Sequence, residues 1–112
     1  MNQEYRCAKR KAVAERIDVW NAMLDVRVGV IGNISETGML LISSTPVTDD
    51  ALYQFRFGLP VNGRMHDIEV GAHQVWTDVS RPPGQLWVGF RFIDIAPQDL
   101  ELLRTYIGPT GD

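Results

Sequence analysis

The sequence contains a single cysteine, Cys7, among its 112 residues, so an internal disulfide is impossible. It also lacks any apolar run near the roughly 20 residues that a membrane-spanning helix requires. The N-terminus MNQEYRCAKRKAVAER has no apolar segment of the kind found in signal peptides. These absences favour a cytoplasmic protein that does not enter a membrane. The hydrophobic fraction of 45% is typical of a globular chain, and the length predicts one domain over residues 1–112.

Residues that support catalysis or metal binding are also scarce. The two histidines, His66 and His73, lie on opposite parities of one alternating segment, and the lone cysteine is far from both in sequence. They form no convincing metal-ligand set, so neither a metal site nor a cofactor is expected. The sequence has no nucleophile elbow, no phosphate-binding glycine loop and no HExxH motif. It therefore predicts a binding protein and not an enzyme.

What the sequence does contain is a repeated alternation of apolar and polar residues, the pattern of half-buried strands. Six segments show this alternation or form a short apolar run. They are Val13–Trp20, Leu24–Ile31, Met39–Ile42, Tyr53–Leu59, Ile68–Ala72 and Leu86–Phe92. The alternation changes phase at Val75, which predicts a β-bulge near Ala72–Gln74.

Turn residues separate these segments. Asn62-Gly63 predicts a tight hairpin, because a type I′ turn needs positive φ at both central residues. Helical spacing occurs only near the C-terminus, where Pro97 suits a first turn and Gly108 a C-cap, so a helix is expected over 96–107. Six short strands with such turns predict an all-β barrel or sandwich over 12–94.

The charge is distributed unevenly along the chain. The net charge is −3, yet residues 1–16 hold five Lys or Arg against two Glu. A net negative charge argues against general affinity for nucleic acid, whereas a short basic segment on an acidic body suggests a local site for an anion. The alternative is a solvated chain end, which the charge alone does not exclude. We expect residues 1–11 to be flexible in the absence of a ligand.

Two short motifs supply the residues of such a site. Arg6 and Arg10 lie four residues apart, and the segment Asn33-Ile-Ser35-Glu-Thr-Gly38 lies between two predicted strands. Asn and Ser favour turns and offer hydrogen bonds, and glycine allows a positive φ or a close approach to the backbone. An ordinary hairpin connection would explain the second motif equally well if it stood alone.

Together the motifs RxxxR and NxSxxG, in this order, resemble those of the PilZ domain family. Val75-Trp76 and Val88-Gly89-Phe90-Arg91-Phe92 resemble two later strands of the family, and the terminal helix is also in its place. The resemblance covers nearly the whole chain. It implies a six-stranded antiparallel, Greek-key-like β-barrel with a C-terminal α-helix, and it implies a bacterial receptor for cyclic di-GMP.

The resemblance assigns the binding of cyclic di-GMP to Arg6, Arg10, Asn33, Ser35 and Gly38, with Lys9 and Trp76 as additional candidates. Arginine suits this ligand because its planar fork can grip a phosphate or the O6 and N7 atoms of guanine. Tyr5 stands where some members of the family carry another arginine, which favours one dinucleotide per protein and leaves an intercalated pair open.

The order of the motifs suggests a switch in which the ligand clamps the basic segment against the Asn33–Gly38 turn and so signals to an effector protein. A homodimer through Trp20, Trp87 or the helix is a further expectation. Motility and biofilm formation are among the processes that such a receptor controls. The alternatives are a PilZ-like adaptor that acts through protein contacts without nucleotide, and, less favoured, a small barrel that binds nucleic acid.

Overall fold

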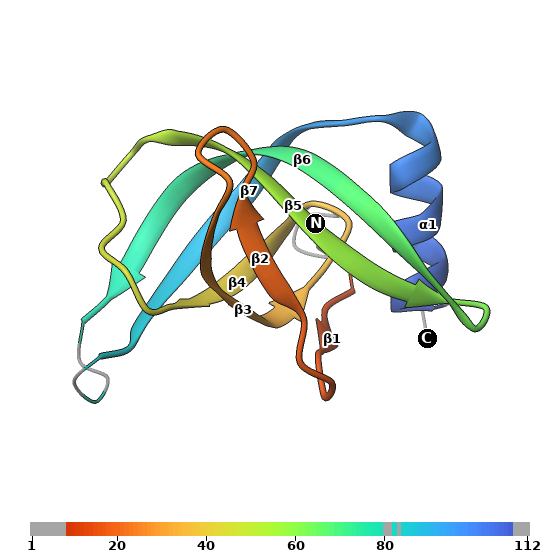
Figure 1. Ribbon diagram of the computed structural model, residues 1–112, viewed down its shortest axis with the longest axis horizontal. Helices are drawn as coiled ribbons and strands as arrows, with labels where there is room; N and C mark the ends of the chain where they lie inside the picture. The colour runs from red at the N-terminus through yellow and green to blue at the C-terminus, as the bar shows by residue number, and fades with distance from the viewer. Residues whose placement is uncertain (1–8, 80–81, 83, 109–112) are drawn as a thin grey trace, which may run out of the picture.

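The computed structural model describes residues 9–79, 82 and 84–108. Within them the chain forms seven strands and one helix (Figure 1). The strands are β1 (Lys11–Ala12), β2 (Asp18–Asn21), β3 (Val26–Ile34), β4 (Gly38–Ser43), β5 (Leu52–Val61), β6 (Arg64–Asp78) and β7 (Leu86–Ile95), and the helix is α1 (Pro97–Ile107). The all-β prediction with a C-terminal helix is therefore confirmed.

The strands close into an antiparallel barrel. Their order is β1-β3-β2-β5-β6-β7-β4, and an additional β3–β4 pairing joins the two sides. Six strands form the closed barrel, and β1 is an extra strand that pairs with the end of β3 at Ile34 and Asn33. The hairpin β5–β6 turns at Asn62-Gly63, whose φ angles of 52° and 78° confirm the predicted type of turn. Closure of the barrel protects strand edges that would otherwise favour aggregation.

The prediction of a first strand over Val13–Trp20 was wrong in its extent. Only Asp18–Asn21 forms β2, and Lys11–Ala12 forms β1 further along the same edge of β3. Between these two short strands the backbone leaves the sheet and keeps isolated hydrogen bonds, from Val13 N to Gly32 O and from Ile31 N to Ile17 O. The alternation of residue types continues through this stretch although the pairing does not.

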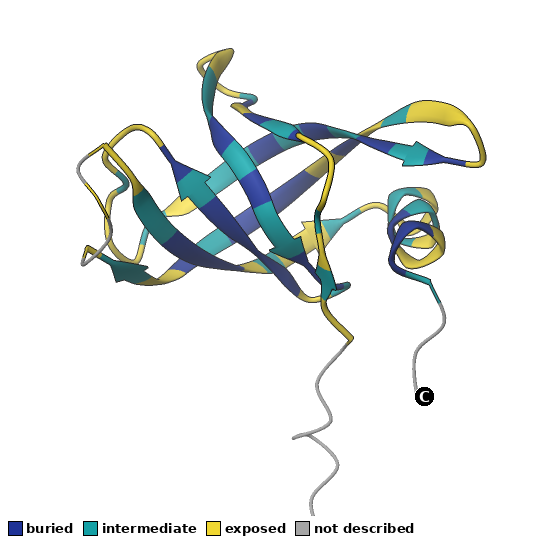
Figure 2. Ribbon diagram, turned by 90° about the horizontal axis from the view of Figure 1, so that it is seen from below, coloured by how far each residue is buried: buried dark blue, intermediate teal, exposed yellow. Residues whose placement is uncertain are grey.

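The core fills the barrel and extends to the helix. Figure 2 shows buried and partly exposed residues alternating along the strands, and the buried side of α1 facing the barrel. In β3 the buried parity includes Ile31, at 3% exposed, whereas Val30 is only half-buried. The sequence pattern of β3 does not show which of these two residues points into the core, because both faces of the strand carry apolar residues.

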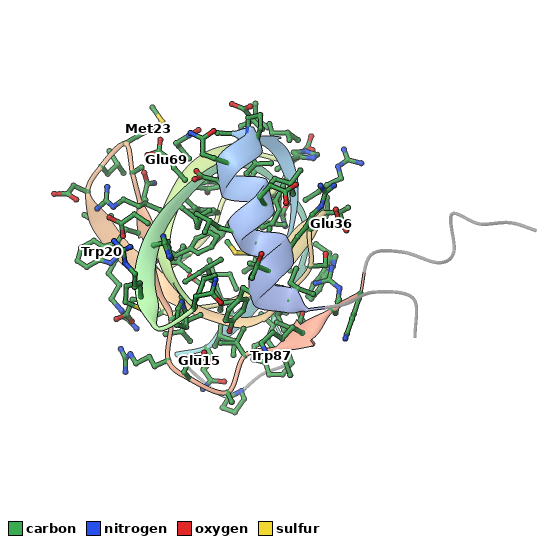
Figure 3. All side chains as sticks on the ribbon, turned by 90° about the vertical axis from the view of Figure 1, so that its right-hand side faces the viewer. Glu15, Trp20, Met23, Glu36, Glu69 and Trp87 are labelled. Atoms are coloured by element: carbon green, nitrogen blue, oxygen red, sulfur yellow. The ribbon has the colours of Figure 1, made fainter. Side chains whose placement is uncertain are left out.

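Helix α1 lies across one end of the barrel (Figure 3). It begins with Pro97 at its first turn and is capped after Ile107 by Gly108, whose φ of 94° lies in a region that glycine tolerates best. Leu103, Tyr106 and Ile107 are its buried residues. No helix among the described residues has the length and the apolar character needed to cross a membrane.

Candidate functional site

Two of the β-bulges in the barrel place side chains of β3 and β6 on its outer face. In β3, Ile31 pairs with Leu41 and Asn33 pairs with Leu40, so Gly32 is an extra residue. In β6, Gln74 pairs with Phe90 and Trp76 pairs with Gly89, so Val75 is extra. One extra residue reverses the side on which the following side chains lie.

The consequence is that Asn33 and Trp76 both lie on the outer face. Ile31 and Ile34 on either side of the first bulge are 3% and 0% exposed, and Asn33 between them is half-buried. Gln74 before the second bulge is 4% exposed, whereas Trp76 after it is 48% exposed. The predicted phase change in β6 is thus confirmed, with Val75 as the extra residue. The bulge in β3 was not predicted.

The outward residues form one row across four neighbouring strands. Asn33 of β3 pairs with Leu40 of β4, Leu40 pairs with Gly89 of β7, and Gly89 pairs with Trp76 of β6. Adjacent strands lie about 4.8 Å apart, so the row spans about 14 Å of barrel surface. Pairing therefore brings together two predicted site residues that are far apart in sequence.

A cavity of about 370 Å³ covers this row. Its lining residues are Arg10, Asn33, Met39, Leu40, Val75, Trp76, Trp87, Gly89 and Phe90. Three of the predicted or additional site residues, Arg10, Asn33 and Trp76, thus line one cavity.

Arg10 reaches the row from the chain that precedes β1. Its Nη1 donates a hydrogen bond of 2.6 Å to Oδ1 of Asn33, and the guanidinium is exposed. Because β1 pairs Ala12 with Asn33, the backbone holds Arg10 beside the cavity. A charged donor strengthens such a bond, and the exposed guanidinium carries further N–H donors of the kind that hold an anion. Arg6 lies outside the described residues, and Lys9 is exposed but does not line the cavity.

Ser35 organises the turn between β3 and β4 and is itself 1% exposed. Its Oγ accepts hydrogen bonds from the backbone N–H groups of Thr37, at 3.1 Å, and Gly38, at 3.2 Å. Its own N–H donates to Gly38 O at 2.8 Å. Such a side-chain contact satisfies backbone donors that a tight turn leaves unpaired. Ser35 thus holds the turn that follows Asn33, and it does not line the cavity.

Gly38 is required for a reason that the sequence did not indicate. A Cβ atom at this position would overlap the carbonyl oxygen of Phe90 in β7 and lie 3.4 Å from Cα of Arg91. The backbones of β4 and β7 therefore approach too closely for any other residue. Close packing of these two strands beneath the site therefore accounts for a glycine at position 38, and a contact of Gly38 with a ligand stays a prediction.

Trp76 lies against Gly89. A Cβ atom at Gly89 would overlap Nε1 and Cε2 of the indole, which shows that the ring covers this glycine. One side of the ring is thus packed on the sheet while about half of the side chain is exposed. A fixed, half-exposed aromatic ring is a suitable platform for a planar base. Gly89 and Leu40 were not predicted as site residues, because their roles depend on the register of the strands.

The residue that follows the first motif, Lys11, and one residue within the second motif, Glu36, also contact α1. Nζ of Lys11 lies 5.0 Å from the ring centroid of Tyr106, and Nε of Arg104 donates to Oε1 of Glu36 at 2.9 Å. Burial raises the pKa of Tyr106 to about 12, and the carboxylate of Glu15 adds to the shift. The ion pair with Glu36 raises the pKa of Arg104. Figure 3 shows Glu15 and Glu36 near opposite edges of the helix.

Neither histidine takes part in this site. His73 Nε2 lies 2.6 Å from Oδ1 of Asp50, on the other side of the bulge in β6. Among the described residues, no three His, Cys, Asp or Glu side chains gather as they would around a metal ion. The cavity offers a cation, an amide and an aromatic ring, a set suited to binding a ligand that combines negative charge with planar bases.

The fold and this surface define a class of protein domain, namely a small closed antiparallel barrel with a helix across one end and a cavity on its outer wall. Residues 4–108 match the model of the PilZ domain. The chain therefore belongs to the PilZ domain family, a family of receptor and adaptor domains for cyclic di-GMP.

Solved structures agree on the fold. The inhibitor of motility MotI/DgrA of Bacillus subtilis superposes with a TM-score of 0.70 at 15% identity, and the match covers 87% of this chain. The chain spans 46% of that protein's length. The PilZ domain of CeSA from a cellulose-synthesizing bacterium superposes with a TM-score of 0.56 at 16% identity, covering 86% of this chain and 91% of the other. No curated protein sequence gives a significant match.

Proposed function

We propose that this chain is a bacterial cyclic di-GMP receptor that changes conformation on binding and signals to a protein partner. The observation that carries the proposal is the convergence of Arg10, Asn33 and Trp76 on one outer-face cavity. These residues come from three separate segments, and the two bulges are needed to bring them together. The membership of the PilZ family supports the choice of ligand.

Each of the three side chains would contact a different part of the ligand. The guanidinium of Arg10 would hold a phosphate or the O6 and N7 edge of a guanine, and Asn33 would orient that guanidinium. The exposed side of the Trp76 ring would stack on the second guanine. Arg6, four residues before Arg10, would close over the same ligand. Ser35 and Gly38 would shape the wall on which the ligand rests.

The contacts of α1 support signalling. Lys11 follows directly after Arg10 and lies over the Tyr106 ring, while Glu36 in the second motif pairs with Arg104. A ligand that repositions Arg10 or the Asn33–Gly38 turn would therefore disturb contacts at two residues of the helix. Movement of the basic segment and of α1 would change the surface offered to a partner.

Calorimetry with cyclic di-GMP tests the proposal, with GMP as the ligand control. Arg10→Ala and Arg6→Ala should each weaken binding about 5- to 150-fold, since one bidentate contact to a base contributes about 1–3 kcal/mol. Arg64→Ala is the matched control, because it removes the same charge from an exposed residue at the β5–β6 hairpin, far from the cavity lining.

Three results would contradict the proposed function or the proposed location of the ligand. If the wild type binds no cyclic di-GMP, the receptor proposal fails and an adaptor that acts without nucleotide becomes the better account. If both arginine variants bind as the wild type does, the ligand lies elsewhere. If polynucleotides bind with an affinity that falls steeply as the salt concentration rises, the chain is a nucleic-acid-binding barrel.

A further inference from the structure

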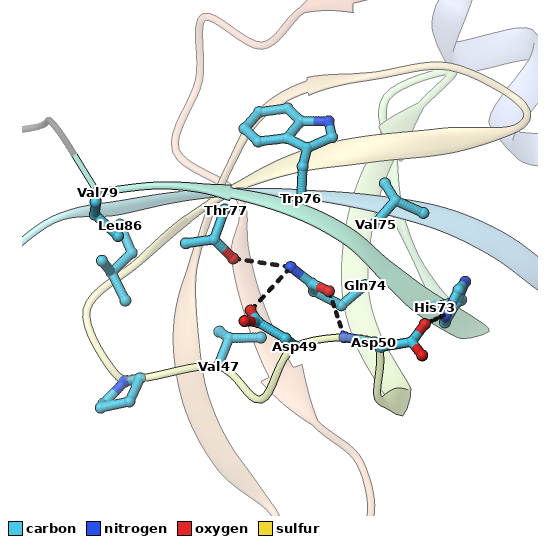
Figure 4. Close-up of a pocket in the computed structure, with 11 residues that line it drawn as sticks. Val47, Asp49, Asp50, His73, Gln74, Val75, Trp76, Thr77, Val79 and Leu86 are labelled. Atoms are coloured by element: carbon cyan, nitrogen blue, oxygen red, sulfur yellow. Dashed lines mark hydrogen bonds and ion pairs between the residues drawn. The ribbon is translucent and has the colours of Figure 1, made fainter.

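A second hollow, of about 690 Å³, lies beside the cavity of the candidate site and is formed by β6 and the connection between β4 and β5 (Figure 4). Its lining residues are Pro46, Val47, Asp49, Asp50, His73, Gln74, Val75, Trp76, Thr77, Val79 and Leu86. Val75 and Trp76 line both hollows, so the bulge of β6 forms the wall between them.

The floor of this hollow is already ordered by hydrogen bonds. Gln74, at 4% exposed, accepts a bond from the backbone N–H of Asp50 through Oε1, and its Nε2 donates to Oγ1 of Thr77 at 2.9 Å. Its backbone N–H donates to Ala51 O at 3.0 Å. Figure 4 shows Gln74 between the β4–β5 connection and β6, with the Trp76 ring pointing away from it. The buried amide thus holds the connection against the strand without a ligand.

The walls combine apolar side chains with negative charge. Val75 is 48% exposed and Val79 is 75% exposed, and Leu86 lies beside Val79 in Figure 4. Asp49 and Asp50 are exposed at the rim, where Nε2 of Gln74 lies 3.5 Å from Oδ1 of Asp49 and Nε2 of His73 lies 2.6 Å from Oδ1 of Asp50. The described lining contains no Lys or Arg. A pair of carboxylates repels the phosphates of a dinucleotide, so this hollow is unsuited to the ligand of the neighbouring cavity.

We propose that this hollow is a docking surface for a partner protein, and that the partner presents an apolar side chain flanked by Lys or Arg. Exposed apolar side chains grouped in an ordered hollow are typical of interaction surfaces. The acidic rim selects a basic segment, because complementary charge guides encounter and rejects partners of like charge. The shared Trp76 wall couples this surface to the nucleotide site, and that coupling alone rests on the proposed function.

Selection of random 12-residue peptides displayed on phage tests the surface without requiring that the partner be identified. The immobilised protein is the wild type, and the hollow is altered by D49K combined with V79S. The matched control is D67K combined with M23S, which makes the same charge change and truncates an equally exposed apolar residue away from the hollow. The enriched peptides are then synthesised and titrated against all three proteins by calorimetry.

The proposal predicts sequences in which Leu, Val or Phe is flanked by Lys or Arg. These peptides should bind the wild type and the D67K/M23S control variant equally. They should bind the D49K/V79S variant, called here the hollow pair, about tenfold more weakly, because one apolar contact and an attractive charge are lost. Acidic consensus sequences, no enrichment, or equal binding to the hollow pair would overturn it. Sedimentation that shows a dimer abolished by the hollow pair would assign the surface to a second copy instead, and would equally overturn it.

Repeating the titration with saturating cyclic di-GMP tests the coupling. A change in peptide affinity supports the shared wall, and an unchanged affinity in a protein that binds the nucleotide overturns the coupling. If the wild type binds no nucleotide, the proposed function fails, and the docking surface is decided by the peptide titrations alone.

Discussion

Because Trp76 packs on Gly89, we expect Gly89→Ala to destabilise the wild type and to stabilise a variant that lacks the Trp76 ring. In Gly89→Ala the added methyl group would overlap Nε1 and Cε2 of the indole and lie 2.8 Å from Cζ2. The obstacle is a side chain and not backbone, so the ring can swing away while the strand stays in place. The substitution should therefore displace Trp76 and leave the barrel folded.

The expected cost follows from the surface that the ring loses. Aromatic side chains bury about 150–250 Å², and Trp76 is 48% exposed, so about 100 Å² is covered. At about 25 cal/mol per Å² this burial contributes about 2–3 kcal/mol. Replacing a strand glycine by alanine returns about 0.5–1 kcal/mol through lower chain entropy in the unfolded state. The net free energy of unfolding should fall by about 1–2 kcal/mol, the difference of these two contributions.

In the background of Trp76→Ala the ring is absent, and only the favourable contribution remains. Gly89→Ala should then raise the free energy of unfolding by about 0.5–1 kcal/mol. Urea denaturation of the wild type, the two single variants and the double variant, followed by far-UV circular dichroism, measures this cycle. Equal destabilisation in both backgrounds would show that the conflict is with the backbone and would refute the stacked arrangement.

The remaining predictions concern the turn, the strand contact beneath it and the helix. Gly38→Ala should lower the free energy of unfolding by about 1–3 kcal/mol, because the methyl group meets a backbone carbonyl. Gly58→Ala, whose methyl group meets the end of a flexible methionine and, at ordinary contact distance, Oδ1 of Asp67, should be near neutral in the same urea titration. Ser35→Ala should cost about 1–3 kcal/mol, because the buried N–H of Gly38 and the N–H of Thr37 lose their acceptor, and an unchanged urea midpoint would contradict its role in holding the turn. Burial raises the pKa of Tyr106 from its ordinary value of 10 to about 12 in the folded protein. The neutral phenol therefore contributes fully to the free energy of unfolding below pH 10, and this contribution, at most about 3 kcal/mol, is lost as the pH rises to about 12. Tyr106→Phe should lack this decline, and parallel curves for the two proteins between pH 9 and 12 would contradict it.

Much of the fold could be predicted because the signals are local. Alternation identified the regions of five barrel strands and a short apolar run identified that of β4, Asn62-Gly63 identified its hairpin, and Pro97 with Gly108 bracketed the helix. The extent of the first strand could not be predicted in this way. The residues between Ala12 and Asp18 keep the alternating pattern, yet β3 pairs there with two short strands and the connection between them leaves the sheet.

Three of the predicted residues, Arg10, Asn33 and Trp76, line the cavity, and the geometry that brings them together could be predicted only in part. A phase change at Val75 revealed the bulge that turns Trp76 outward, but the bulge at Gly32 left no such sign, since its neighbours are apolar on both parities. The roles of Gly38 and Gly89 depend on which strand lies opposite. That information comes only from the pairing, because sequence spacing says nothing of which backbone or ring will occupy the missing side-chain position.

We propose that Arg10, Asn33 and Trp76 form a single nucleotide-binding surface. Amide and indole chemical shifts, recorded by NMR while cyclic di-GMP is added, test it most directly. We predict saturable shifts at residues 10–12, 33–38, 75–76 and 88–90 and at the Trp76 indole N–H, with little change at β2 and the β5–β6 hairpin. The absence of saturable shifts, or shifts centred on β2 and β5 instead, would contradict it.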